Sequence, residues 1–302
     1  MPRTPFVAGI ALAFAFAPAP PTALARQPIT DPPGGRTKVL GVPETPGVTL
    51  FDDLVRLHVE RSLSGRIPEA PDGEPLRSSV YVTLTVEAAW MWDKPIVRFE
   101  RGLFPRASLA ACPKACSIPL RDAAMGALIE HDEYLNAAGL DFGPRFLVVA
   151  DAELPAETLL LALRSLASAS SGAPAGMDLL YRTPRGLRSV PVYIPPPDPI
   201  PIRAAASPLL ADIQITAKGW EARATHVYLP QPVTVSAEPA LLSFIGDLRS
   251  RDPAKRVAFV SAPDRVTVRE VARLVELVHR EYPVVVLKPP GPIATRISER
   301  AR

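Results

Sequence analysis

The chain has 302 residues, of which 47% are hydrophobic and 22% are charged, with 34 basic and 31 acidic side chains. This apolar content excludes a wholly disordered chain, and the length is sufficient for two domains. A formal net charge of +3, with the two signs interspersed, gives no electrostatic reason to expect nucleic acid as a partner.

The first 25 residues have the pattern of a secretory signal peptide. Arg3 supplies a positive charge, residues 6–17 are apolar or small without interruption, and Ala23-Leu24-Ala25 fits the small-x-small cleavage pattern. An apolar run of 12 residues followed by prolines is shorter than the roughly 20 needed to span a membrane. We therefore predict export to the periplasm, or secretion, with no transmembrane segment after signal removal. An uncleaved membrane anchor is the alternative.

Residues 26–74 are predicted to form a flexible lead and one helix. Proline and glycine are frequent in residues 26–48, which lack periodicity, whereas residues 49–63 (TLFDDLVRLHVERSL) have helical spacing and begin with Thr49 as an N-cap. We expect this helix to pack against the rest of the chain. A partner-binding helix is the alternative interpretation.

A strand–helix–strand unit occurs twice along the chain. In residues 145–184 an apolar run, a helix-starting proline and apolar residues at helical spacing precede a second apolar run, and residues 256–289 repeat this order. A slide of 111 positions superposes the two stretches and places Leu163 on Leu274. The short apolar run at 146–150 predicts a strand that is buried on both faces.

Two further patterns define the predicted helices. Thr267 and Glu270 have capping-box spacing ahead of the apolar positions of the second copy, so a helix should begin there. Residues 123–135 predict a helix in the first copy, with Met125 and Ile129 among the residues that face inward.

The repeat predicts an α+β fold of two tandem small modules, each a mixed sheet with two helices on one face. Module 1 covers residues 75–189, and module 2, a degenerate copy, covers residues 202–290. Between them the proline-rich stretch 190–201 (VPVYIPPPDPIP) predicts a linker, and residues 291–302 form a basic tail. We expect the modules to face one another as a single-chain pseudo-dimer, monomeric in solution, because their edge strands would otherwise be exposed.

The two cysteines, Cys112 and Cys116, lie in a segment of module 1 that module 2 lacks. In an exported protein, cysteines this close together are predicted to form a disulfide. A zinc site would need about four nitrogen or sulfur ligands, and a thiol redox centre usually has C-x-x-C spacing. Both remain alternatives to the disulfide.

The order of the predicted elements, with Ala150-Asp151 ending a strand ahead of Leu154-Pro155 and a helix, resembles the periplasmic domain of the ExbD/TolR family. The resemblance covers residues 78–186 and, more faintly, residues 207–290. It implies a small sheet carrying two helices on one face. It also implies a role in biopolymer or protein transport across the cell envelope, near proton-driven energy transduction, with envelope proteins or peptidoglycan as partners.

Members of that family carry an N-terminal transmembrane helix with an aspartate that takes part in proton coupling. Residues 1–25 contain no acidic residue and too short an apolar run, so the resemblance does not extend to that role. Where the first copy has Ala150-Asp151, the second has Ser261-Ala262, so any function of this motif is limited to one copy.

No sequence motif points to catalysis, a cofactor or a metal. The chain lacks the G-x-S-x-G, Walker, G-x-G-x-x-G and H-E-x-x-H patterns. The densest ionisable cluster is Glu-His-Asp-Glu at 130–133, whose neighbours on a helix point about 100° apart and predict a solvated face. We therefore predict a non-catalytic binding or scaffold protein. The alternative is an envelope hydrolase whose site is assembled from Asp151, His131 and Glu133.

Three residues are candidates for partner binding. Trp90 and Trp92 are close together in a predicted turn, where aromatic side chains form either a binding platform or hairpin-end packing. Asp151 is the third candidate. It could equally satisfy backbone N–H groups in the turn from strand to helix.

Overall fold

The computed structural model describes residues 46–63, 66–77, 79–109, 116–137, 145–169, 176–194, 200–202, 210–216, 219–225, 233–235, 237–251, 253, 257–263, 266–288 and 295–297. All of them belong to the compact unit Pro43–Arg302. The predicted signal peptide, the proline-rich lead as far as residue 45, and Cys112 lie outside the described residues.

Six helices and thirteen strands form within the described part of the chain. The helices are α1 (Pro46–Leu63), α2 (Arg106–Leu109), α3 (Ile118–Ala137), α4 (Ala156–Ala167), α5 (Glu238–Arg251) and α6 (Val268–His279). The strands are β1 (Val80–Leu84), β2 (Ala88–Met91), β3 (Lys94–Arg98), β4 (Arg145–Ala150), β5 (Gly176–Thr183), β6 (Gly186–Tyr193), β7 (Ile200–Ile202), β8 (Leu210–Thr216), β9 (Gly219–Thr225), β10 (Val233–Val235), β11 (Val257–Ser261), β12 (Val284–Lys288) and β13 (Thr295–Ile297).

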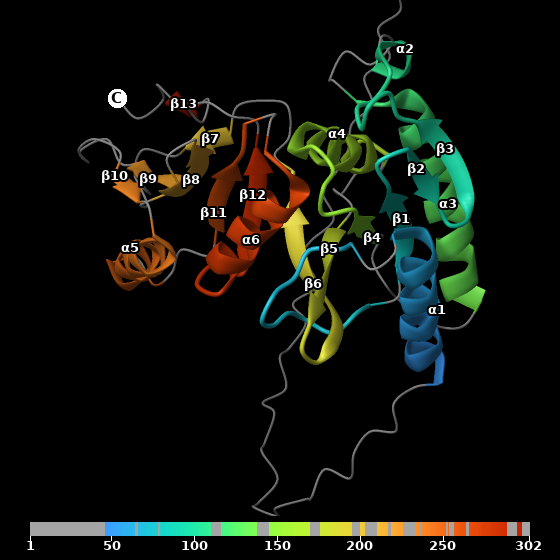
Figure 1. Ribbon diagram of the computed structural model, residues 1–302, viewed down its shortest axis with the longest axis horizontal. Helices are drawn as coiled ribbons and strands as arrows, with labels where there is room; N and C mark the ends of the chain where they lie inside the picture. The colour runs from blue at the N-terminus through green and yellow to red at the C-terminus, as the bar shows by residue number, and fades with distance from the viewer. Residues whose placement is uncertain are drawn as a thin grey trace, which may run out of the picture. The chain divides into compact units, whose positions relative to one another are not determined.

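Eleven of these strands form one mixed sheet, in the order β10-β9-β8-β11-β12-β6-β5-β4-β1-β2-β3 (Figure 1). The predicted α+β class is confirmed. The two expected sheets, however, are joined into one, because β6 pairs on both sides. It forms an antiparallel hairpin with β5 and pairs in parallel with β12 through Val192 and Tyr193.

The predicted linker begins too early. Val190 to Tyr193 belong to β6, where Pro191 lies opposite Asp178 in the register with β5. Proline has a fixed φ that extended backbone tolerates, and it removes only its own N–H donor. A single proline therefore does not end this strand. The small second sheet pairs β7 with β13, which places residues 295–297 of the predicted tail in a strand.

Hydrophobic core covers both faces of the sheet around strand β4. Helices α3, α4, α5 and α6 all contribute to one hydrophobic cluster that includes Val80, Val82, Phe146 and Val148. Helix α1 covers the opposite face, where its Val55, Val59 and Leu63 pack against Leu147, Val149 and Leu180. Strand β4 is therefore apolar at successive positions because both of its faces are covered, as the sequence predicted.

Residues 66–77 form an extended segment, here called the strap, across the tip of the β5–β6 hairpin. The Ala70 N–H donates to the Arg182 carbonyl at 2.9 Å, and Glu74 and Ser189 exchange two hydrogen bonds of 2.8 and 2.9 Å. These contacts cover β5 beyond its pairing with β4 and β6 ahead of its pairing with β12. Most of the strap was predicted as flexible lead; it is fixed because it protects two strand edges.

Candidate functional site

Strand β6 joins two halves of the sheet, a first half β5-β4-β1-β2-β3 and a second half β12-β11-β8-β9-β10. The starts of α4 and α6, one helix from each half, meet in a contact here called the seam. The Ala156 N–H donates to the Val266 carbonyl, and the Val268 N–H donates to the Leu154 carbonyl, each at 2.8 Å. The first N–H groups of a helix have no partner within it. At the seam each helix start is completed by the loop that precedes the other helix.

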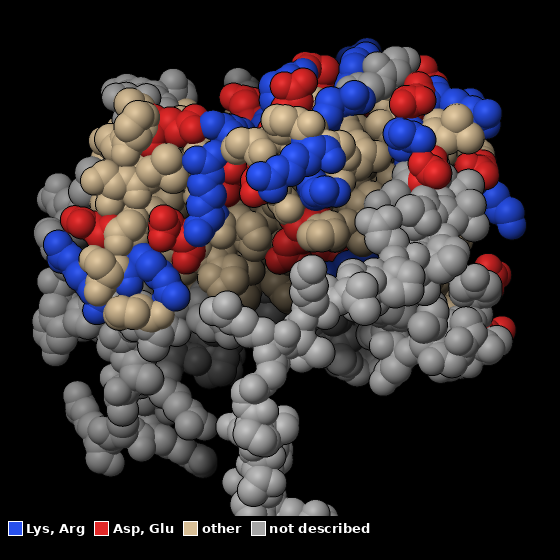
Figure 2. Space-filling view, turned by 90° about the horizontal axis from the view of Figure 1, so that it is seen from below, with Lys and Arg blue, Asp and Glu red and all other residues tan. Residues whose placement is uncertain are grey.

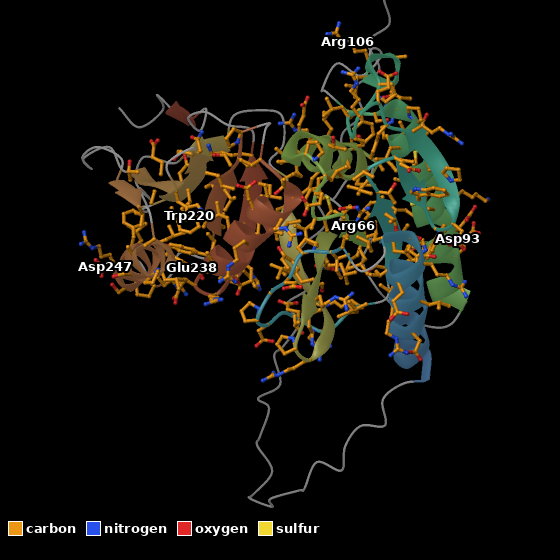
Figure 3. All side chains as sticks on the ribbon, in the orientation of Figure 1. Arg66, Asp93, Arg106, Trp220, Glu238 and Asp247 are labelled. Atoms are coloured by element: carbon orange, nitrogen blue, oxygen red, sulfur yellow. The ribbon has the colours of Figure 1, made fainter. Side chains whose placement is uncertain are left out.

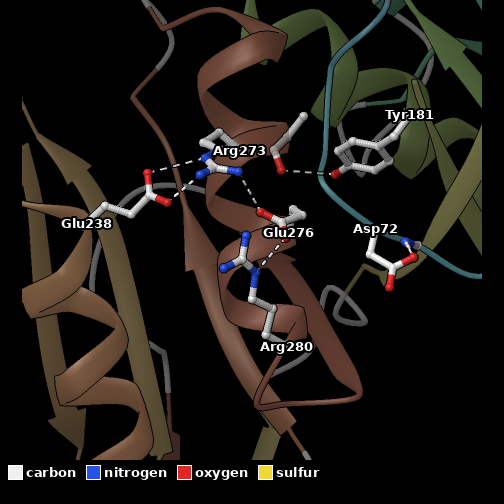
Figure 4. A network of polar contacts seen from close by, with 8 residues as sticks. Asp72, Tyr181, Glu238, Arg273, Glu276 and Arg280 are labelled. Atoms are coloured by element: carbon white, nitrogen blue, oxygen red, sulfur yellow. Dashed lines mark hydrogen bonds and ion pairs between the residues drawn. The ribbon is translucent and has the colours of Figure 1, made fainter. Parts of the chain in front are cut away.

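Tyr181 adds a second link across the seam. Its ring is fully buried, and its hydroxyl donates to the Ala272 carbonyl of α6 at 3.0 Å (Figure 4). Burial raises the pKa of Tyr181, with a smaller contribution from the charge of Glu276, so the hydroxyl stays protonated and remains a donor.

A pocket of about 480 Å³, here called the seam pocket, opens between the strap and the C-terminal end of α6. The strap contributes residues 71–74, β6 contributes Val190, and α6 contributes Glu276, His279 and Arg280. Pockets for small molecules commonly measure about 300–1,000 Å³. This seam pocket therefore has the size of a small-ligand site, and its walls come from segments about 200 positions apart in the sequence.

The α6 wall of the seam pocket is an alternating chain of charges (Figure 4). The Glu276 carboxylate is only 5% exposed and accepts hydrogen bonds from Arg273 Nη1 at 2.9 Å and from Arg280 Nε at 2.7 Å. Arg273 also pairs with Glu238 of α5. A buried carboxylate needs such partners to offset its loss of hydration. In return, the hydrogen bond to Glu276 raises the pKa of Arg280, which stays charged.

The strap wall of the seam pocket is acidic. Asp72 Oδ1 accepts the Gly73 N–H at 2.9 Å, and Glu74 Oε2 pairs with Arg77 Nη2 at 2.7 Å. Glu74 Oε1 lies 3.9 Å from His279 Nε2. Burial lowers the pKa of His279, an effect that the charge of Glu74 opposes without outweighing it. The imidazole at this end of the pocket is therefore neutral at pH 7.

Gly73 allows the strap to lie this close to β6. A Cβ at this position would approach the Cβ of Arg188 to 2.8 Å and the Ser189 carbonyl oxygen to 3.1 Å. Any other residue would push the strap, and the acidic wall of the pocket with it, away from the sheet.

The charged surface around these elements has no dominant sign. In the space-filling view, basic and acidic side chains lie interspersed over the described surface (Figure 2). Within the described residues, no group of three or more metal-ligating side chains is placed to hold a metal ion. None of the described helices combines the length and apolar character needed to cross a membrane.

Of the two predicted tryptophans, Trp92 takes part in an aromatic cluster at the end of the β2–β3 hairpin. Its ring lies edge-on to Tyr81 at 4.7 Å between centroids and 6.4 Å from the ring of His131. Its φ of +52° is unusual for a bulky residue. Trp90 is half-buried within β2, opposite Thr83.

Asp151 is fully buried at the end of β4. Its Oδ2 lies 2.8 Å from Arg66 Nη2 of the strap, and its Oδ1 accepts the Glu153 N–H at 2.9 Å. The carboxylate therefore binds a backbone N–H in the turn from strand to helix. It also anchors one end of the strap.

The predicted site residues are not brought together. The Asp151 N–H bonds to the Leu84 carbonyl, whereas the Trp92 N–H bonds to the Tyr81 carbonyl, three residues earlier on β1. That separation is about 10 Å along the strand. Figure 3 likewise shows Arg66, the partner of Asp151, well away from Asp93, the residue after Trp92. His131 lies beside Trp92, and Glu133 is exposed on α3, so the three residues of the hydrolase alternative do not converge.

Cys116 is buried and disulfide-bonded. Its predicted partner Cys112 lies outside the described residues, so the pairing stays a prediction.

The residues of the seam pocket were missed by the sequence analysis, although local signals exist. Arg273, Glu276 and Arg280 follow one another at helical spacings of three and four, which favour ion pairs. Asp72-Gly73 is a typical turn dipeptide. No local pattern, however, indicates that the strap and α6 meet.

Comparisons with protein-family models, with curated proteins and with solved structures gave no match to this chain. The resemblance to the ExbD/TolR family therefore stays a prediction from the sequence.

Proposed function

We propose that this chain is a non-catalytic periplasmic binding or scaffold protein made of two fused modules that resemble the ExbD/TolR periplasmic domain. The reciprocal seam contact carries the proposal. The two donors, Ala156 and Val268, are 112 positions apart in the sequence, and so are the two acceptors, Leu154 and Val266. In a two-fold interface, residue i of one copy meets residue j of the other, and the reverse contact also forms. The seam has this reciprocity.

The strand order also supports two fused copies. On one side of β6 the strands run β5-β4-β1-β2-β3, and on the other β12-β11-β8-β9-β10, with matching parallel and antiparallel pairs. Helices α3 and α5, and likewise α4 and α6, follow equivalent strands. The copies join edge to edge through β6, which is how the proposed pseudo-dimer protects its inner edges.

The offset predicted from the sequence pattern, 111 positions, is one residue short at the helices. An offset of 112 positions aligns the first helical residues Ala156 and Val268, and it also aligns the fully buried Leu163 and Val275. Leucine and valine repeat at several adjacent positions in both copies, so the pattern alone does not fix the register.

The electrostatics of the seam pocket support binding. The carboxylate of Glu276 already accepts hydrogen bonds from two arginines and so holds Arg280 in place for binding. A cellular role in envelope transport or integrity, with envelope proteins or peptidoglycan as partners, follows from the predicted export and the family resemblance.

Affinity capture tests the proposed function. The mature chain, residues 26–302, is immobilised and exposed to detergent-solubilised envelope fraction, and separately mixed with purified peptidoglycan and sedimented. We expect one specific envelope protein, or the peptidoglycan, to be retained. Trp92→Ala should weaken retention, whereas Trp220→Ala, a half-buried tryptophan on β9, is the matched control. Retention of neither material would refute the envelope role.

Light scattering after size exclusion tests the fused pair. A monomeric mass is expected, because the surfaces that would join two copies are already occupied at the seam. A mass twice that of the mature chain would contradict the pseudo-dimer.

A further inference from the structure

We propose that the seam pocket binds a small zwitterion with a free ammonium group and a free carboxylate, of the size of an amino acid or a short peptide. The ammonium group would lie against the strap and the carboxylate against Arg280. This inference names the ligand class of the site and rests on the proposed binding role.

Arg280 supplies the anion-binding end. Its Nε is fixed by Glu276, whereas its two Nη groups make no hydrogen bond to any other described residue, and its side chain is 38% exposed. Guanidinium N–H groups in this planar fork match the two oxygens of a carboxylate. Glu276 in turn is braced by Arg273, so the fork is held in place before a ligand arrives.

The strap supplies the cation-binding end. Asp72 and Glu74 bring two negative charges to the pocket, and among the described residues only Arg77 pairs with either of them. His279, which lies 3.9 Å from Glu74, is neutral at pH 7 because burial lowers its pKa. Arg145, whose charge also interacts with Glu74, is already paired with Asp178. The strap wall therefore keeps a net negative charge. An ammonium group is the natural complement, with three N–H donors for carboxylate and carbonyl oxygens.

The arrangement favours a ligand that carries both charges. A simple anion would meet Asp72 and Glu74 across the pocket, and a simple cation would meet Arg280. Pro71, next to Asp72 on the strap, provides exposed apolar surface for the uncharged part of the ligand. A volume of about 480 Å³ leaves room for a short peptide together with water.

Isothermal titration calorimetry of the mature chain at pH 7 tests the inference with three probes. Alanyl-alanine carries both charges, N-acetyl-alanyl-alanine lacks the ammonium group, and alanyl-alanine amide lacks the carboxylate. We expect alanyl-alanine to bind and each blocked probe to bind at least about tenfold more weakly.

Variants assign the two ends. Arg280→Gln should weaken alanyl-alanine by about tenfold and leave the weak affinity of the amide unchanged, whereas Arg280→Lys should retain part of the binding. Glu74→Gln should weaken alanyl-alanine by about tenfold and leave the weak affinity of N-acetyl-alanyl-alanine unchanged. Arg106→Gln, an exposed arginine of α2 labelled in Figure 3, controls for the loss of one positive charge. Thermal unfolding confirms that each variant is folded.

No heat of binding with alanyl-alanine up to about 10 mM, or binding that ignores both pocket variants, would overturn the inference. The envelope capture experiment distinguishes this failure from that of the proposed function. Capture that succeeds while alanyl-alanine fails to bind removes only the ligand assignment.

Discussion

The starts of α4 and α6 occupy equivalent places at the seam but are stabilised by different side chains. Helix α4 follows Pro155, which provides no side-chain cap, and the buried Asp151 binds the preceding turn. Helix α6 follows Thr267, whose N–H donates to Glu270 Oε2 at 2.8 Å in a capping box. The reciprocal seam bonds therefore hold two helix starts whose local side-chain contacts differ.

The buried ion pairs of the two halves differ in the same way. In the first half Arg145 of β4 holds both carboxylate oxygens of Asp178 on β5, at 2.6 to 3.0 Å. In the second half Lys288 of β12 lies 3.3 Å from Asp212 of β8. The two halves of the sheet therefore differ in the charged residues that they bury.

The largest effect is expected from breaking the first of these pairs. Asp178→Ala should lower the free energy of unfolding by about 3 kcal/mol, because Arg145, only 20% exposed, would lose its partner. Urea denaturation measures the change. Asp53→Ala, which breaks an exposed pair on α1, should cost less than about 1 kcal/mol. Equal costs for the two variants would show that the Arg145–Asp178 pair contributes no more to stability than an exposed ion pair.

The two helix starts are compared directly by removing their different stabilising groups. Asp151→Ala should cost about 2 kcal/mol, because the Glu153 N–H and Arg66 both lose an acceptor. Thr267→Ala should cost about 1 kcal/mol through loss of an N-cap. Urea denaturation ranks the pair. A larger cost for Thr267→Ala would show that the first junction does not depend on its carboxylate.

A smaller effect is expected from the side-chain link across the seam. Tyr181→Phe removes the hydrogen bond to the Ala272 carbonyl but leaves the ring in place, and should cost about 1 kcal/mol. Tyr81→Phe, a half-buried tyrosine on β1 in the first half of the sheet, is a control of the same chemistry outside the seam. Unchanged stability in Tyr181→Phe would mean that this hydrogen bond does not help to hold the halves together.

The smallest expected difference between the two halves is in how their stability depends on pH. Burial lowers the pKa of His58 and His131 in the first half and of His279 in the second, with nearby carboxylates only partly opposing it. These histidines stay neutral when folded, whereas the unfolded chain takes up protons below about pH 6.5. Stability is therefore complete above that pH and falls below it.

Urea denaturation at several values between about pH 7.5 and pH 5.5 measures this loss. Replacing His58 and His131 with glutamine should flatten the pH dependence more than replacing His279. The opposite ranking would place the pH-sensitive part of the fold at the seam.

The sequence by itself determined the local elements where one pattern dominates. The apolar run at 146–150 predicted a strand buried on both faces, and β4 is covered by helices on one face and by α1 on the other. The Thr267–Glu270 spacing predicted the capping box that begins α6. Both signals are local, because a helix cap and an apolar run depend on neighbouring residues.

Other features were decided only by the tertiary structure. Met125 and Ile129 were predicted to face inward, yet they are 48% and 56% exposed, because α3 presents Leu120, Ala124 and Ala127 to the sheet instead. Helical periodicity alone does not determine which apolar stripe is covered. That choice belongs to the strands beneath the helix.

The strap, the single sheet and the seam pocket also depend on contacts between distant segments. Residues 71–74 meet α6 because the β5–β6 hairpin leaves edges that the strap covers on one side and β12 extends on the other. Unpaired backbone N–H and C=O groups at a strand edge must find partners wherever the chain brings them. Which segments meet is set by those edges in three dimensions, and no stretch of sequence contains that information alone.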